Sequence, residues 1–131
     1  MFPVTRVYSD AKGESRFEDV LIPLIDAGEI GFLSDELPAK GIIFREVKPS
    51  YDYNFHNAPQ KQYLILIDGV IEIETSLGEK RTFKAGDVLL LEDTSGKGHR
   101  TRNVVEAKRR SVFVTLASPQ LLPPFSRSVF S

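Results

Sequence analysis

The chain has 131 residues, which is typical of one domain that buries a real hydrophobic core. Its 17 basic and 18 acidic residues leave a formal charge of -1, so we expect no nucleic-acid partner. It has no cysteine, which excludes disulfides, thiolate nucleophiles and cysteine-bound zinc. No stretch approaches the roughly 18 apolar residues that span a bilayer, and we therefore expect a cytoplasmic protein with no membrane partner.

Short apolar runs rich in Val, Ile, Phe and Tyr alternate with clusters of Gly, Pro, Asp and Ser, as in all-β sandwiches and barrels. The stretch 62–75 predicts a hairpin in which Asp68-Gly69 makes the turn, and Leu77-Gly78-Glu79 predicts another turn. About ten strands favour a closed or double-sheet barrel, which has few exposed edges. The further strands are expected at 4–8, 17–25, 41–48, 51–56, 80–84, 88–92, 98–105 and 111–117.

We expect a single domain over residues 1–131, with N-terminal strands in 1–25, a barrel core at about 41–117 and a C-terminal arm at 118–131. Prolines interrupt the apolar arm, which predicts an extended segment in place of a helix. The arm packs on its own barrel or on a second subunit in this interpretation, and a frayed terminus is the alternative. Apolar residues at both ends of the chain favour a homodimer. Those of the arm are Leu121, Leu122, Phe125 and Phe130.

One group of residues lies at the start of the predicted 62–75 hairpin. Six residues separate Gln62 from Gly69, and Ala58 and His56 lie just upstream. This spacing resembles the first motif of the cupin superfamily, H-x-H-x(3,4)-E-x(6)-G. Gln62 then stands at the glutamate position and Ala58 at the second histidine position, so two of the three ligands in that motif are replaced.

A second group begins at Gly86, with 16 residues between it and Gly69, where Gly86-Asp-Val-Leu-Leu-Leu predicts a turn and a strand. His99-Arg-Thr-Arg-Asn103 ends this group. It resembles the second cupin motif, G-x(5)-P-x-G-x(2)-H-x(3)-N, although the loop 92–98 lacks the proline and is two residues longer. The chain thus looks like a small single-domain cupin with a degenerate first motif.

The resemblance implies an all-β, jelly-roll barrel of the cupin type (a double-stranded β-helix), with His56, Gln62 and His99 converging inside it. A typical cupin site holds a divalent metal through three imidazoles and one carboxylate. Here only two imidazoles remain, and Gln62 offers a neutral amide. The resemblance therefore implies either no metal or a weakly bound divalent ion (Fe, Mn, Ni or Zn) on His56, Gln62 and His99.

The only two histidines of the chain fall on motif positions, which favours acid/base catalysis by His56 and His99, because imidazole titrates near neutrality. The alternative for each is a buried neutral histidine that bonds to its barrel neighbours. Strand alternation predicts His99, Thr101 and Asn103 on one face and Arg100 and Arg102 on the other, solvated face.

The same barrel interior is predicted to include Gln62, Arg45, Tyr53, Thr101 and Asn103 as pocket residues. Gln62 is an orienting hydrogen-bond partner, a ligand, or a core amide that the backbone satisfies. On the strand 41–48, either Phe44 and Glu46 or Ile43 and Arg45 face inward. An inward Arg45 would match a carboxylate or phosphate on the ligand, whereas a surface ion pair is the other interpretation.

Two further features have structural interpretations. Gly96-Lys97-Gly98 lacks the spacing of a phosphate-binding loop and predicts a flexible turn. Asp93 and Thr94 have the side chains of Asx and hydroxyl turns, which explains them without a ligand.

Three functions follow, and the fold does not decide among them. The first is a small-molecule enzyme of the isomerase, dehydratase or lyase type, which uses the barrel pocket for proton transfer. The second is a non-catalytic ligand-binding or sensor protein. The third is an oligomerisation scaffold whose pocket is closed and filled by side chains. A bound metal with open coordination positions would instead favour a metal-dependent dioxygenase.

Overall fold

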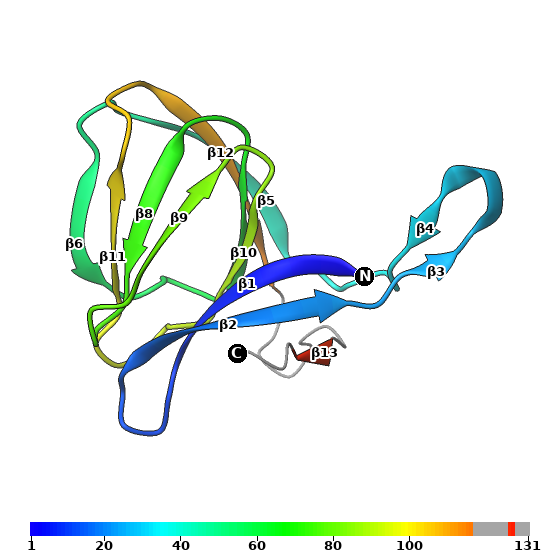
Figure 1. Cartoon of the computed structure of the whole chain (residues 1–131), viewed down its shortest axis with the longest axis horizontal. Helices are drawn as coiled ribbons and strands as arrows, with labels where there is room; N and C mark the ends of the chain where they lie inside the picture. Colours follow the sequence, from blue (N-terminus) through cyan, green and yellow to red (C-terminus); the bar gives the residue numbers. More distant parts are fainter. Residues whose placement is uncertain (117–125, 128–131) are drawn as a thin grey trace.

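The computed structural model describes residues 1–116 and 126–127 (Figure 1). The predicted arm at 118–131 thus lies outside the described residues, except for the backbone of one two-residue strand. The described residues contain no helix that is long and apolar enough to cross a membrane. The elements are β1 (Phe2–Ser9), β2 (Ser15–Ile22), β3 (Ile25–Asp26), the 3-10 turn η1 (Gly28–Ile30), β4 (Phe32–Leu33), β5 (Gly41–Val47), β6 (Asp52–His56), β7 (Gln62–Leu66), β8 (Val70–Glu74), β9 (Lys80–Lys84), β10 (Val88–Leu91), β11 (His99–Asn103), β12 (Arg109–Thr115) and β13 (Ser126–Arg127).

Strands β5 to β12 form two facing sheets with the strand orders β5-β12-β7-β10 and β6-β11-β8-β9. The chain crosses repeatedly from one sheet to the other, which is the topology of an eight-stranded jelly roll. Strands β1 and β2 extend the first sheet, because β1 pairs parallel with β10 and antiparallel with β2. The predicted all-β fold and jelly-roll barrel are confirmed, and the ten longer strands correspond to the ten expected ones.

The predicted 62–75 hairpin is wrong. β7 pairs with β10 and β12 in the first sheet, whereas β8 pairs with β9 and β11 in the second. A type I′ hairpin turn needs positive φ at both central residues, but only Gly69 has it, at 79°. The Asp68-Gly69 corner therefore carries the chain between sheets. The turn predicted at Leu77-Gly78-Glu79 does join a hairpin, β8–β9.

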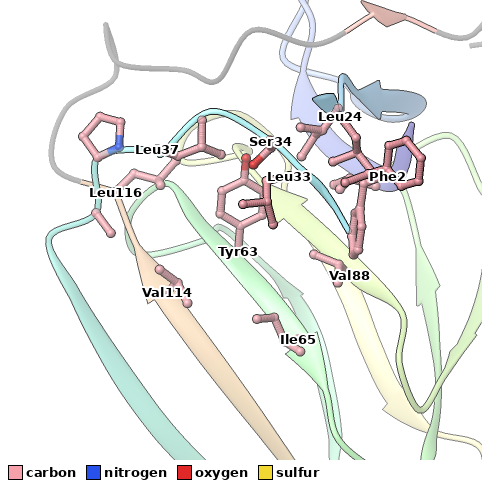
Figure 2. A pocket seen from close by; sticks show the side chains of 15 residues that line it. Phe2, Leu24, Leu33, Ser34, Leu37, Tyr63, Ile65, Val88, Val114 and Leu116 are labelled. Carbon is pink, nitrogen blue, oxygen red and sulfur yellow. The ribbon is translucent and has the colours of Figure 1, made fainter. Parts of the chain in front are cut away.

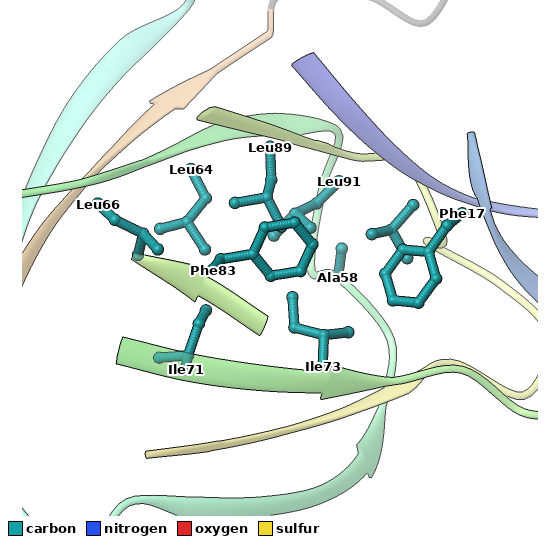
Figure 3. Packing of buried hydrophobic residues seen from close by; sticks show 10 residues of the cluster. Phe17, Ala58, Leu64, Leu66, Ile71, Ile73, Phe83, Leu89 and Leu91 are labelled. Carbon is teal, nitrogen blue, oxygen red and sulfur yellow. The ribbon is translucent and has the colours of Figure 1, made fainter. Parts of the chain in front are cut away.

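The core lies between the two sheets (Figure 3). Leu64 and Leu66 of β7 and Ile71 and Ile73 of β8 meet in it, each at most 4% exposed. Full burial of such a side chain stabilises the fold by about 1.5–3 kcal/mol. The apolar side chains of β7 face those of β8 across the barrel, and this arrangement buries both rows. Burial of both rows explains why β7 and β8 lie in different sheets.

The residues between β2 and β5 leave the barrel (Figure 1). The predicted strand 17–25 ends earlier than expected, at Ile22, and the short β3–β4 hairpin follows it. This hairpin projects from the barrel and has exposed apolar side chains at Ile25, Ile30, Phe32 and Leu33.

Candidate functional site

A cavity of about 370 Å³ opens between the two sheets of the barrel. This volume suits a small organic molecule. Side chains from both sheets and from the loop after β6 contribute to its wall. The lining residues are Ile43, Arg45, Tyr51, Tyr53, His56, Asn57, Ala58, Pro59, Gln60, Gln62, Leu64, Ile73, Leu91, His99, Thr101 and Phe113.

His99 is the most buried titratable residue of the cavity wall, at 3% exposed. Its Nδ1 lies 2.5 Å from Oδ2 of Asp93, a carboxylate that is itself completely buried. A carboxylate accepts, so the neutral His99 ring carries its proton on Nδ1 and keeps the Nε2 lone pair free. The buried pair holds His99 in the tautomer of a general base.

His56 lies against His99, with ring centroids 4.6 Å apart, and Tyr53 covers it at 3.9 Å. Its Nδ1 donates to the carbonyl oxygen of Asn54 at 2.8 Å, which also leaves Nε2 as the free nitrogen. Burial lowers the pKa of His56, and the positive charge of Arg45 lowers it further. His56 is therefore neutral at neutral pH and can accept a proton.

Four polar side chains of the wall make no hydrogen bond to another described residue. They are Gln60, Gln62, which is 3% exposed, Thr101, which is 6% exposed, and the outer Tyr53. The hypothesis that the backbone satisfies the Gln62 amide does not hold among the described residues. Polar groups that line a cavity without a protein partner are available to a ligand.

Arg45 faces inward with Ile43, whereas Phe44 is 77% exposed, which settles the alternative left open by the sequence. Arg45 does not form the surface ion pair that the sequence also allowed, because no described carboxylate bonds to it. The outward prediction for Arg100 and Arg102 agrees with the structure. Arg100 pairs with Asp52, and Arg102 pairs with Glu72.

Asn103 does not line the cavity, so its predicted place in the pocket is wrong. Its Nδ2 donates to the carbonyl oxygens of Lys48 and Pro49, and its Oδ1 accepts from Nε of Arg109 at 2.6 Å. Strand alternation puts Asn103 on the same face of β11 as His99, but Asn103 lies at the other end of the strand. There it holds the β5–β6 turn.

The residues present do not fit the metal centre that the cupin resemblance implies. No group of three or more His, Asp or Glu side chains that could hold a metal ion occurs in residues 1–116. The position of the second motif histidine is Ala58, a core residue 3% exposed, and Asp93 already binds His99. Two imidazoles and the neutral Gln62 amide are a weak donor set.

The interpretation of Asp93 as a turn residue missed its role beside His99. The longer loop of the second motif was the available signal, because it holds Asp93 six residues before His99 and lets the two side chains meet. Gly98 makes this possible: a Cβ there would lie 2.2 Å from the carbonyl oxygen of His56. The loop thus brings Asp93, His99 and His56 together.

A second cavity, of about 410 Å³, lies on the outer face of the first sheet (Figure 2). Its wall is almost entirely apolar, with Val88 and Val114 from the sheet and Leu33 and Leu37 from the segment that crosses it. Tyr63 reaches into it with a buried hydroxyl that bonds to no other described residue. Burial raises the pKa of Tyr63 to about 12, so this hydroxyl stays neutral.

No family model matches the chain, and no curated protein matches it. Among solved structures the chain is similar to a cupin 2 conserved barrel domain protein from Salinispora arenicola, with 22% identity and a TM-score of 0.49, over 61% of this chain and 65% of that one. It is also similar to protein NMB1881 from Neisseria meningitidis, with 23% identity and a TM-score of 0.46, over 59% and 75%. A sugar 3,4-ketoisomerase from Thermoanaerobacterium thermosaccharolyticum is similar at 15% identity and a TM-score of 0.42, over 85% and 87%.

The strand order identifies the fold more directly than these likenesses do. Two four-stranded sheets in jelly-roll order enclose the cavity, and the two motif histidines lie on the paired strands β6 and β11, where His99 is the register partner of His56. The fold is of the cupin type. The cupin-type barrel supplies the scaffold, and the chemistry depends on the cavity side chains.

Proposed function

We propose that this cupin-type barrel is a small-molecule enzyme that transfers protons within its cavity, in a reaction of the isomerase, dehydratase or lyase type. The observation that carries the proposal is the buried Asp93–His99 pair. Asp93 is fully buried and bonds to Nδ1 of His99, which leaves Nε2 as the reactive nitrogen of a cavity-lining ring.

The chemistry is proton abstraction from a carbon next to a carbonyl group. A substrate C–H bond breaks, its proton passes to Nε2 of His99, and the electron pair moves onto the carbonyl oxygen. The Asp93 carboxylate stabilises the imidazolium that forms. The proton then returns to a neighbouring atom of the substrate, which completes an isomerisation, or leaves with a hydroxyl group as water.

The other polar side chains of the cavity have matching roles. His56 is neutral and its ring lies beside that of His99, so it is the second proton carrier for the other end of the substrate. The Gln62 amide and the Thr101 hydroxyl have no described protein partner and line the same cavity. They are the donors for the oxygen that gains negative charge in the transition state.

A non-catalytic ligand-binding protein is the second candidate. Ala58 favours it, because this buried alanine stands where the first cupin motif has a histidine. In that case the same cavity would bind its ligand, and His99 would act only as a hydrogen-bonding group.

The test is deuterium incorporation from D2O, followed by NMR, into a panel of 2-keto acids, 2-hydroxy acids and small keto sugars. We expect the wild-type chain to catalyse exchange in at least one class, and His99→Asn to lower the rate by about 10²–10⁴-fold. Asp93→Asn should lower it as well, because the amide permits the wrong His99 tautomer.

Asp52→Asn is the matched control, because Asp52 pairs with Arg100 on the outer face. We expect it to exchange at the wild-type rate. Absence of exchange across the panel, or full activity of His99→Asn, would contradict the proposal, and ligand binding without exchange would favour the second candidate. The homodimer and the cytoplasmic location stay predictions, for sedimentation and cell fractionation to test.

A further inference from the structure

We infer that the Arg45 end of the cavity binds a carboxylate, so that the substrate of the proposed proton transfer is a small organic acid. The inference rests on the proposed function only in treating the bound acid as a substrate. The binding of the anion depends on a separate group of residues: Arg45, Tyr51 and Arg109.

Arg45 is a cation without a counter-ion. Its Nε donates to Oγ of Ser111 at 3.0 Å, and its guanidinium lies over the Phe113 ring, 4.5 Å from the centroid. No described carboxylate bonds to it, and the cavity wall contains no Asp or Glu among its 16 described residues. A buried charge normally has a partner, because removal from water is costly.

A second unpaired guanidinium lies behind the first. Arg109 is 1% exposed, its Nε donates to Asn103, and neither of its terminal nitrogens has a hydrogen-bond partner. Arg45 and Arg109 both lie over the Tyr51 ring, 5.8 and 5.3 Å from its centroid. Asp68, whose charge raises the pKa of Arg109, is already bonded to Arg110.

These contacts concentrate positive charge at one end of the cavity. Burial and the charge of Arg45 together lower the pKa of Arg109 to about 10, and both guanidinium groups remain cationic at neutral pH. The Ser111 hydroxyl takes the Nε of Arg45 and the Tyr51 hydroxyl also bonds to the guanidinium, so the remaining terminal N–H groups are the fork that is available to a carboxylate. A bound anion would offset the charge of both guanidinium groups.

The position of the fork agrees with the proposed chemistry. Arg45 and the two histidines line one cavity, and Arg45 is near enough to lower the pKa of His56. A carboxylate held at Arg45 would place the adjoining carbon atoms on the side of His56 and His99. Orientation by such a clamp is a large part of what an enzyme supplies.

The experiment compares pyruvate with pyruvamide, its neutral analogue of similar shape, by isothermal titration calorimetry. We expect pyruvate to bind more tightly than pyruvamide, and Arg45→Gln to weaken pyruvate binding by about 10- to 100-fold without changing pyruvamide binding. Arg45→Lys should restore part of the loss. Arg100→Gln is the matched control, because it removes one positive charge from the outer face.

Equal affinities for the two probes, or wild-type affinity in Arg45→Gln, would overturn the inference. An equal loss in Arg100→Gln would also overturn it, because the effect would then come from net charge. Inorganic phosphate is the third probe, and tighter binding of phosphate than of pyruvate would overturn the assignment to a carboxylate.

His99→Asn separates this inference from the proposed function. We expect that variant to bind pyruvate normally and to lose deuterium exchange. Arg45-dependent binding with no exchange in the wild-type chain would contradict the proposed function alone. Exchange that does not depend on Arg45 would contradict the anion site alone.

Discussion

The two faces of the first sheet differ in chemistry although the same strands build them. On β7, Gln62 and Leu64 point into the barrel cavity, whereas Tyr63 and Ile65 line the outer groove (Figure 2). The inner face has unpaired polar groups directed at one space, and the outer face has a single buried hydroxyl in an apolar wall. Alternation along one strand thus separates a partly polar cavity from an apolar groove.

The largest expected effect is at the loop that builds the inner face. Gly98→Ala combines a φ of 72° with a Cβ only 2.2 Å from the carbonyl oxygen of His56. We expect it to lower the free energy of unfolding by about 3 kcal/mol or more, measured by urea denaturation. Gly78→Ala is the control: its φ is 90° but no atom lies within 4 Å, so about 1 kcal/mol is expected. Equal losses would show that the Gly98 contact has no special role.

The next largest difference is expected between truncations of apolar residues on the two faces, which should lower the free energy of unfolding by different amounts. Leu89 is 0% exposed in the inner core, and Leu89→Ala should cost about 2–5 kcal/mol. Ile65 is half-buried in the outer groove, so Ile65→Ala should cost about 1 kcal/mol. Urea denaturation of both variants measures the difference, and a larger loss from Ile65→Ala would reverse the assignment of core and groove.

The outer hydroxyl should be dispensable. Tyr63→Phe removes a buried hydroxyl that has no described partner, so the free energy of unfolding should stay equal or rise by up to about 1 kcal/mol. Thermal denaturation checks this. A clear loss of stability would mean that the hydroxyl has a partner in the folded protein.

His56, on the wall of the barrel cavity, should make the free energy of unfolding depend on pH. Burial lowers the pKa of His56 below its unfolded value, so the unfolded chain binds more protons between the two values. The contribution is therefore present above about pH 6.5 and is lost as the pH falls through the lowered pKa. We expect urea midpoints to fall between pH 7.5 and pH 5, and His56→Asn to reduce that fall. An unchanged pH dependence in the variant would contradict the assignment.

Metal removal should have the smallest effect. His56, Gln62 and His99 form a weak donor set, so chelation with EDTA should shift the melting temperature by less than about 2 °C. Elemental analysis of the purified protein should likewise find far less than one divalent ion per chain. A stoichiometric ion together with a large shift would contradict this reading of the cavity.

Local signals located most strands correctly but not their partners. The alternating apolar pattern predicts the segments that became β7 and β8, and Gly69 predicts a corner between them. The predicted pairing between these two strands was wrong, because burial of both apolar rows across the barrel stabilises the fold more than a short hairpin would. Such burial depends on residues far away in the chain, which a local pattern does not contain.

The site shows the same division. Motif spacing predicted that His56 and His99 share the barrel, and they are register partners. It did not reveal Asp93, because its turn chemistry explains the residue equally well. It also left the direction of Arg45 open, because two alternations fit the strand 41–48 equally well.

The sequence by itself determined the all-β class, the approximate strand positions and the two histidines of the cavity, because these depend on residue type and short-range spacing. Only the tertiary structure decided that Asp93 bonds to His99, that Asn103 bonds to a turn, and that Arg45 and Arg109 both lie near the Tyr51 ring without a described counter-ion. Each of these is a contact between separate segments, and closure of the barrel brings the segments together.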